Sequence, residues 1–458
     1  MHNTSRLLDI IDRAYHGPVA DEKEFDLKVV ADGVATSVKK YELKFDKTKI
    51  IQPDDALNDR LWQAGLDFFE QCGVYCTSTS RRITFTRREI EETLKWAPAA
   101  VVIGEGRDAR TERHRRVEDE QPPIVIGGPI GTPLTEALYI PIMQSYIQEP
   151  IVDTVTSGTL ETTYGRRPRT RSPLEVLAAW QEVELLFSAA RRAGRPGMAF
   201  GAVQMAISDI GHLTAISRNG YRPTDWAMIA MVSELKTNTE LLNKLAHSVR
   251  QDQIIHSFYN PILGGLGGGE EGLAVLIVGG IIAMQMIYMA ATHCTAPTTP
   301  SLPIASVPQV LRPISAAIAA ISRNSTLMTD VMTQPIAGPG TDILLYECLA
   351  TATVATVCGV SRLMGPRSAT GVHTNHCTGL ESRFNGEVGH AATRLSRAEA
   401  DEIVKKAVEM YKPHLQSKPF GRRFEELYDP VTVKPGDEWL AIYDRVKAQA
   451  AEWGMPFK

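Results

Sequence analysis

The 458-residue sequence lacks an excess of positive charge. Its 53 Asp and Glu residues outnumber 49 Lys and Arg residues, which gives a formal net charge of -4. Without a basic surface, nucleic acid and an acidic membrane are poor default partners. We therefore expect an enzyme that acts on a small molecule and has neither a nucleic-acid nor a membrane partner.

The sequence also lacks a disulfide framework and an apolar secretory segment after Met1. Its six cysteines are scattered along the chain, without the short, regular spacing that is typical of small secreted domains. These two absences predict a protein of the reducing cytoplasm.

No stretch of the sequence is convincing as a membrane span. The most apolar stretch, residues 273–291, has nearly the length of about 20 residues that a spanning helix needs. Gly279 and Gly280 divide it into the apolar runs 273–278 and 281–291. Such a division is typical of a buried parallel strand and the helix that follows it, so we predict a buried core segment here.

The sequence does contain a repeated alternation of short apolar runs and helical segments. Residues 1–120 are charge-rich and helical in period, whereas glycine and proline separate short apolar runs from Pro123 onward. Strand, glycine turn and capped helix repeated over roughly 280 residues predict an α/β fold, a (β/α)₈ TIM barrel. The predicted parts are an N-terminal helical extension (1–120), the catalytic barrel (121–400) and a C-terminal helical segment (401–458).

A doubly wound nucleotide-binding sheet is the alternative architecture. The richest glycine run, residues 264–269, lacks the Lys-Ser/Thr pair of a phosphate-binding loop and matches a dinucleotide motif only weakly. No strand, glycine loop and helix signature opens the series of repeats. These observations favour the barrel.

Several short phrases follow one another in a specific order along nearly the whole chain. They include residues 72–77, 106–109, 195–198, 337–339 and 386–388. In this order the phrases resemble the monomethylamine:corrinoid methyltransferases of methanogens. The resemblance implies a barrel enzyme and a homo-oligomer. It also implies methyl transfer to Co(I) of a corrinoid (cobalamin) that a separate small corrinoid protein carries.

The sequence departs from that family at the reactive residue. By register, Gly201 stands where the family has the pyrrolysine that holds methylamine as an adduct. Four polar residues that surround the pyrrolysine fall on Met228, Phe258, Met332 and Gln334, and only Gln334 is still polar. We therefore predict a substrate pocket at these five positions that is larger and more apolar than the pocket of the family, and that suits a donor without an ammonium group.

The leaving group decides which methyl donor such a pocket can use. A neutral amine leaves badly, whereas a phenolate, whose conjugate acid has a pKa of about 10, can leave when it is protonated or bound to a Lewis acid. A methoxylated aromatic compound, demethylated at oxygen, is thus the predicted donor. Two alternatives stay open: a quaternary or other methylated amine such as a betaine, and an inactive relative that only binds the corrinoid protein.

The run from His373 to Cys377 is the candidate metal site. This run offers two or three zinc ligands, namely His373, His376 and Cys377. Because His376 and Cys377 are adjacent, both can bind one ion only with difficulty. A polar loop at the barrel rim is the simpler interpretation. If no metal binds there, either histidine could donate a proton to the departing oxygen.

Glu271, Glu347 and His212 are the candidate catalytic residues. By the resemblance, both glutamates coincide with family glutamates near the catalytic end of the barrel, where each could orient the proton donor or the substrate. Capping or ion pairing is the structural alternative for each glutamate. His212 follows the Gly201 loop, and could complete a zinc site or be an ordinary loop histidine.

Overall fold

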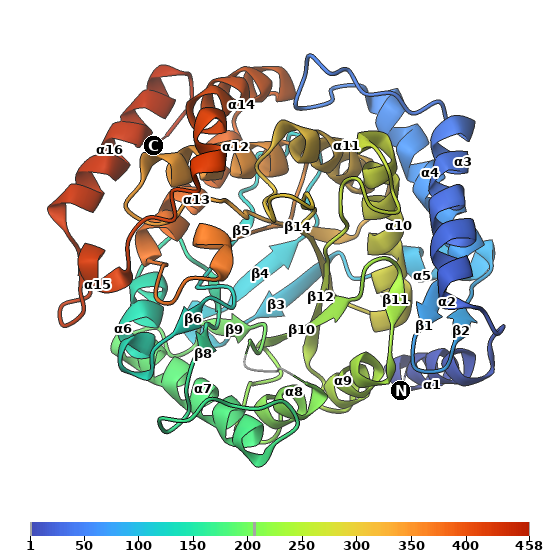
Figure 1. The fold of residues 1–458 in the computed structure, drawn as a ribbon, viewed down its shortest axis with the longest axis horizontal. Helices are drawn as coiled ribbons and strands as arrows, with labels where there is room; N and C mark the ends of the chain where they lie inside the picture. The colour runs from blue at the N-terminus through green and yellow to red at the C-terminus, as the bar shows by residue number, and fades with distance from the viewer. Residues whose placement is uncertain (1, 205–207, 458) are drawn as a thin grey trace.

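A closed barrel of eight parallel strands forms the centre of the computed structural model, which describes residues 2–204 and 208–457. The strands are β5 (Ile124–Gly127), β7 (Thr154–Thr156), β9 (Ala199–Gly201), β10 (Trp226–Met231), β12 (Ile254–Tyr259), β13 (Thr292–Thr295), β14 (Met328–Met332) and β15 (Arg362–Met364). Each pairs in parallel with the next, and β15 closes the barrel on β5. Figure 1 shows them inside a ring of helices. The predicted TIM barrel is confirmed.

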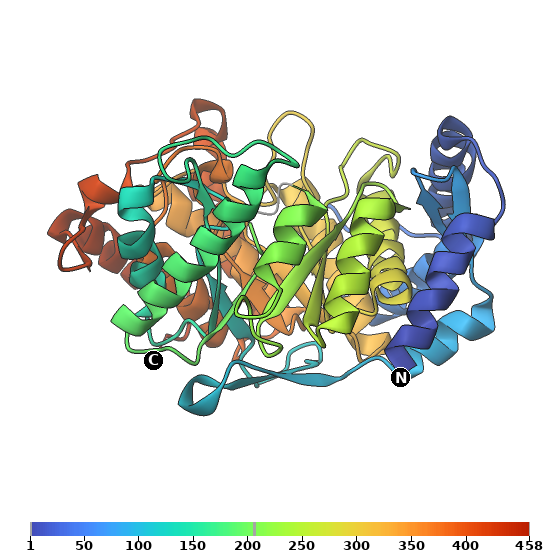
Figure 2. The same ribbon diagram turned by 90° about the horizontal axis from the view of Figure 1, so that it is seen from below.

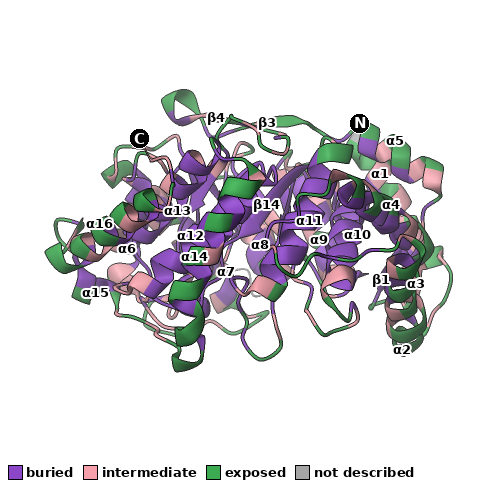
Figure 3. Cartoon of the chain, turned by 90° about the horizontal axis from the view of Figure 1, so that it is seen from above, coloured by how far each residue is buried: buried purple, intermediate pink, exposed green. Residues whose placement is uncertain are grey.

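A helix follows each barrel strand and covers the outside of the barrel. Side chains of Asn238 and Thr341 accept hydrogen bonds from backbone N–H groups in the first turns of α9 and α12, and Thr378 forms a capping box with Glu381 at α13. Figure 3 shows that the inner faces of these helices are buried. The helices are α6 (Glu136–Ile147), α7 (Pro173–Arg192), α8 (Asp209–Ala215), α9 (Thr239–Arg250), α10 (Glu270–Tyr288), α11 (Pro308–Asn324), α12 (Asp342–Val357) and α13 (Gly379–Ala392).

The strand predicted at residues 273–278 is wrong, because the whole stretch belongs to α10. Its glycines serve helix packing: a Cβ atom on Gly279 would lie 2.5 Å from the Phe68 ring of the neighbouring helix α4 (Asp55–Cys72). In the part of the chain that is described, α10 is the one helix long and apolar enough to cross a membrane, and 94% of its most apolar window is buried within the fold. Burial against the barrel and α4 accounts for its apolar sequence.

The N-terminal extension lies beside α10 and α11 and closes the lower end of the barrel. Its hairpin, β3 (Ala100–Ile103) with β4 (Arg110–Arg113), crosses the amino ends of the barrel strands, as the blue hairpin along the lower edge of Figure 2 shows. Its other elements are α1 (His2–His16), α2 (Glu22–Glu24), η1 (Phe25–Ala31), α3 (Asp32–Lys40), β1 (Val74–Cys76), β2 (Arg81–Ile83), α5 (Arg87–Lys95) and η2 (Gly106–Asp108).

The C-terminal segment packs on α12, and its first helix begins at Arg397, before the predicted boundary at residue 400. Its elements are α14 (Arg397–Tyr411), η4 (Lys412–Ser417), α15 (Phe424–Leu427), β16 (Tyr428–Asp429), β17 (Lys434–Pro435) and α16 (Asp437–Glu452). The loops at the carboxyl ends of the barrel strands add β6 (Pro133–Leu134), β8 (Thr159–Leu160), β11 (Lys236–Thr237) and η3 (Ser368–Gly371).

Candidate active site

A cavity of about 410 Å³ lies at the carboxyl ends of the barrel strands, where TIM-barrel enzymes place their active sites. Its apolar wall comes from strands β10, β12, β14 and β15, which contribute Met228, Phe258, Met332 and Met364. The loops that follow the strands contribute its other lining residues: Ile130, Gly131, Gln204, Asn260, Thr298, Pro303, Gln334 and Arg367.

The structure brings four of the five predicted pocket residues together and leaves Gly201 out of the cavity wall. A Cβ atom on Gly201 would lie 2.0 Å from the Trp226 ring. This tryptophan is fully buried, and its Nε1 donates a hydrogen bond to Thr154 Oγ1 at 2.9 Å. The expected open volume at Gly201 is therefore wrong, because an indole fills that place.

Arg367 is the charged group of the cavity wall. Its Nε donates a hydrogen bond to the carbonyl oxygen of Ile130 at 3.2 Å, and burial lowers its pKa. Among residues 2–204 and 208–457, no carboxylate forms an ion pair with Arg367, and no Asp or Glu lines the cavity. The cavity therefore presents a partly desolvated guanidinium without an acidic partner, a group that favours an anionic ligand.

Glu347 supports the cavity from behind. It is fully buried in α12 and accepts hydrogen bonds from Ser306 Oγ at 2.6 Å and from the backbone N–H groups of Ile336 and Ala337 at 3.0 and 2.9 Å. Burial raises the pKa of Glu347 to about 7. These contacts fix the loop after Gln334, so Glu347 is placed to position that loop and does not line the cavity.

The other two candidate catalytic residues lie away from the cavity. Glu271 lies in the first turn of α10 and accepts hydrogen bonds from the Phe45 N–H and from Lys47 Nζ, which ties the N-terminal extension to the barrel. His212 is fully buried in α8, with Nε2 3.4 Å from Ser248 Oγ. Burial keeps the pKa of His212 well below its ordinary value.

The predicted metal run does not form one ligand set. The His373 and His376 rings are 5.4 Å apart, and His376 Nδ1 lies 2.9 Å from the carbonyl oxygen of Phe420. Cys377 is fully buried and interacts with Tyr146. None of the three residues lines the cavity, and in the described part of the chain they do not belong to the ligand-type side chains that lie close enough together to hold one ion.

A different group of ligand-type residues lies inside the barrel. His256, Cys294 and Asp330 come from three consecutive strands, and their ligand atoms all lie within 4.8 Å of one another. This group was not predicted from the sequence because the three residues are far apart in the chain. The available signal was their inward position on adjacent strands, which alternation along each strand could have indicated.

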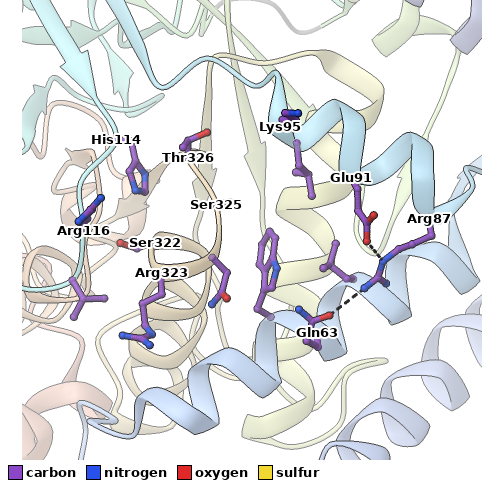
Figure 4. Close-up of a pocket in the computed structure, with 15 residues that line it drawn as sticks. Gln63, Arg87, Glu91, Lys95, His114, Arg116, Ser322, Arg323, Ser325 and Thr326 are labelled. Atoms are coloured by element: carbon purple, nitrogen blue, oxygen red, sulfur yellow. Dashed lines mark hydrogen bonds and ion pairs between the residues drawn. The ribbon is translucent and has the colours of Figure 1, made fainter.

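A second hollow, a groove of about 840 Å³, lies between α4, α5 and α11. Figure 4 shows its basic side chains, among which Arg87 is held by Gln63 and Glu91. His114 in its wall contacts the carbonyl oxygen of Leu327, directly before β14, so the groove lies towards the amino ends of the strands. The cavity at the carboxyl ends is the better candidate active site.

The chain is similar to known proteins along nearly its whole length. The family profile described as Monomethylamine methyltransferase MtmB matches residues 6–455. Monomethylamine methyltransferase MtmB2 of Methanosarcina acetivorans and MtmB1 of Methanosarcina barkeri are each 33% identical over 449 residues, 98% of both chains. The crystal structure of the Methanosarcina barkeri enzyme superposes with a TM-score of 0.96, at 32% identity and 98% coverage of each chain, and the hydroxylamine MtmB complex gives the same values.

Proposed function

Because the chain belongs to the monomethylamine methyltransferase family, we propose that it transfers a methyl group from a methylated amine to the Co(I) corrinoid of a small partner protein. The relatives are named as monomethylamine methyltransferases, which favours a methylated amine as the donor over the methoxylated aromatic compound predicted from the sequence. Arg367 restricts the class of methylated amine further, because its guanidinium lies in the cavity wall without a carboxylate partner in the described residues. We infer a donor with both a quaternary ammonium and a carboxylate, a betaine.

Leaving-group chemistry supports this choice. Gly201 has no side chain that could activate a neutral amine as an adduct, and an indole fills the place beside it. A quaternary ammonium leaves as a neutral tertiary amine, so its departure needs neither an adduct nor a proton donor. The cavity wall holds no Asp, Glu or His among the described residues, which fits a reaction without proton transfer.

The residues of the cavity divide into two groups with separate tasks. Arg367 would bind the carboxylate of the donor through charge-assisted hydrogen bonds. Phe258 offers an aromatic face to the ammonium methyl groups, and Met228, Met332 and Met364 exclude water around them. The chain thereby holds one methyl group towards the barrel mouth. The reduced cobalt of the docked partner would supply the nucleophile, and alignment of the two is the main contribution of the protein.

A methoxybenzoate is the second candidate donor. The four apolar side chains Met228, Phe258, Met332 and Met364 suit a flat ring, and Arg367 would also bind its carboxylate. Its phenolate leaving group, however, calls for a proton donor or a Lewis acid, and the described cavity wall supplies no acidic side chain for that role. We therefore place it behind the betaine.

Calorimetric titration of the isolated chain tests the choice of donor without the partner protein. Trimethylglycine should bind in a one-to-one complex, and monomethylamine, which has no carboxylate for Arg367, should bind at least about tenfold more weakly, a difference of about 1.4 kcal/mol. 4-Methoxybenzoate is the matched competitor, since it keeps the carboxylate and replaces the ammonium with a ring. Tighter binding of 4-methoxybenzoate than of trimethylglycine would favour the second candidate and contradict the first.

A further inference from the structure

Three ligand-type side chains meet inside the barrel, beneath the substrate cavity. His256 on β12, Cys294 on β13 and Asp330 on β14 are completely buried, and their ligand atoms lie within 4.8 Å of one another. Phe258 and Met332, two residues further along β12 and β14, line the cavity above. Because side chains two residues apart on a strand share a face, the group lies one side-chain layer below the cavity floor.

Three of the atoms that could bind an ion have no hydrogen-bond partner in the described residues, whereas the Cys294 thiol lies 3.9 Å from the carbonyl oxygen of Thr295 and interacts with Asp330. His256 Nε2 and both carboxylate oxygens of Asp330 are buried without a partner in the described residues, and the nearest approach between them is 3.6 Å. The other ring nitrogen, His256 Nδ1, lies 2.6 Å from Thr292 Oγ1, a hydroxyl oxygen that can accept the Nδ1 proton. Arg362 Nη1 donates a hydrogen bond to the same Thr292 Oγ1 at 2.8 Å and lies 3.3 Å from His256 Nδ1. With the Nδ1 proton directed to Thr292, Nε2 is free to bind an ion, which is the arrangement that metal-binding histidines usually show. Unpartnered buried polar atoms otherwise cost about 1–3 kcal/mol each.

A divalent cation can balance the buried charges around the group. Arg362 on β15 lies 3.3 Å from Glu112, which the β3–β4 hairpin inserts from below, and both side chains are fully buried. With Asp330 ionised, these groups carry two negative charges and one positive charge. A divalent ion bound by the thiolate of Cys294 would bring the sum to zero, which removes the penalty for a buried unbalanced charge.

We propose that His256, Cys294 and Asp330 bind a zinc ion inside the barrel. A nitrogen, a sulfur and an oxygen ligand form a set that suits zinc, whereas magnesium and calcium prefer oxygen ligands alone. No other described His, Cys, Asp or Glu joins the group, so a water molecule would be the fourth ligand. The ion would join β12, β13 and β14 beneath the cavity and fix the positions of Phe258 and Met332. Binding of this ion does not depend on which methyl donor the cavity binds.

Metal analysis of the full-length chain, purified without chelators, tests the proposal. The unaltered protein should contain one zinc per chain. Cys294→Ser and His256→Gln each remove a ligand, so each should lower metal affinity by more than the about 10- to 100-fold that loss of an outer-shell partner costs. Cys348→Ser is the matched control, because Cys348 is an equally buried thiol in α12 outside the group. After exchange with cobalt(II), the control should keep a thiolate-to-cobalt charge-transfer band that Cys294→Ser lacks.

Two outcomes would overturn the proposed ion. One is an unaltered, folded protein that contains no metal and takes up neither zinc nor cobalt(II). The other is a folded Cys294→Ser or His256→Gln variant, with the circular dichroism of the unaltered protein, that retains the full metal content. Both readouts need neither methyl donor nor corrinoid protein, so failure of the proposed donor would not affect them.

Discussion

Gly201→Ala should lower the free energy of unfolding by about 3 kcal/mol or more, a large effect for one added methyl group. The new Cβ atom would lie 2.0 Å from the Trp226 ring, which cannot move aside easily. That ring donates a hydrogen bond to Thr154, packs at 5.0 Å against the His256 ring and lies 4.7 Å from the Arg362 guanidinium. Denaturant unfolding, followed by circular dichroism, measures the loss.

A matched control and a second-site change make this prediction specific. Gly269→Ala adds the same methyl group where its nearest neighbour would be 3.9 Å away, so it should change stability by less than about 1 kcal/mol. Trp226→Ala should make the added methyl group harmless, so Gly201→Ala should cost much less in that background than alone. Equal stabilities for Gly201→Ala, Gly269→Ala and the unaltered protein would contradict the packing described here.

Arg367→Met should weaken the binding of trimethylglycine by about 100-fold, which corresponds to about 2.8 kcal/mol. The substitution keeps an unbranched side chain in the cavity wall and removes the charge that we assign to the donor carboxylate. Truncation of one partner in a buried hydrogen-bonded charge pair costs about 2–5 kcal/mol, so the expected loss is at the lower end. Calorimetric titration measures it directly.

Choline and a surface arginine provide the controls. Choline keeps the quaternary ammonium and lacks the carboxylate, so its affinity should not fall in Arg367→Met, and removal of the like charge should raise it. Arg116→Met removes an exposed arginine from the groove of Figure 4 and should leave both ligands unaffected. Undiminished binding of trimethylglycine to Arg367→Met would remove the main support for a carboxylate-bearing donor.

Most of the fold could be predicted from the sequence because the barrel pattern is local. Short apolar runs, glycine turns and capped helices repeat in order, and the resemblance to the methyltransferase family is confirmed by relatives that cover nearly the whole chain. The exception is α10, where Gly279 suggested a break between strand and helix. The glycine instead lets α4 approach closely, a role that only the three-dimensional contact with Phe68 reveals.

The candidate site was harder to predict than the fold. Alignment with the family shows which residues correspond to its pocket, but it does not show which side chains fill the space between them. Met228, Phe258, Met332 and Gln334 line one cavity, yet the place beside Gly201 is taken by Trp226, a residue of the neighbouring strand. A side chain from an adjacent strand can fill a vacancy that a linear comparison leaves open.

Polar side chains from distant loops and strands were not predicted, because their neighbours in the structure are far away in the sequence. Arg367 and the His256–Cys294–Asp330 group acquire their significance only from neighbours far along the chain. Glu271, Glu347 and His212 carry ionisable side chains, but their partners in the structure are backbone groups, Lys47 and hydroxyls outside the cavity. Residue type alone could not separate a supporting role from a catalytic one.

Identification of the demethylated product in a single turnover tests the proposed donor most directly. The chain, mixed with a reduced corrinoid protein and trimethylglycine, should consume the Co(I) absorbance and release one dimethylglycine for each cobalt methylated. Monomethylamine in the same mixture should leave the Co(I) absorbance unchanged. Cobalt methylation by monomethylamine or by 4-methoxybenzoate, without any release of dimethylglycine from trimethylglycine, would contradict a carboxylate-bearing quaternary amine as the substrate.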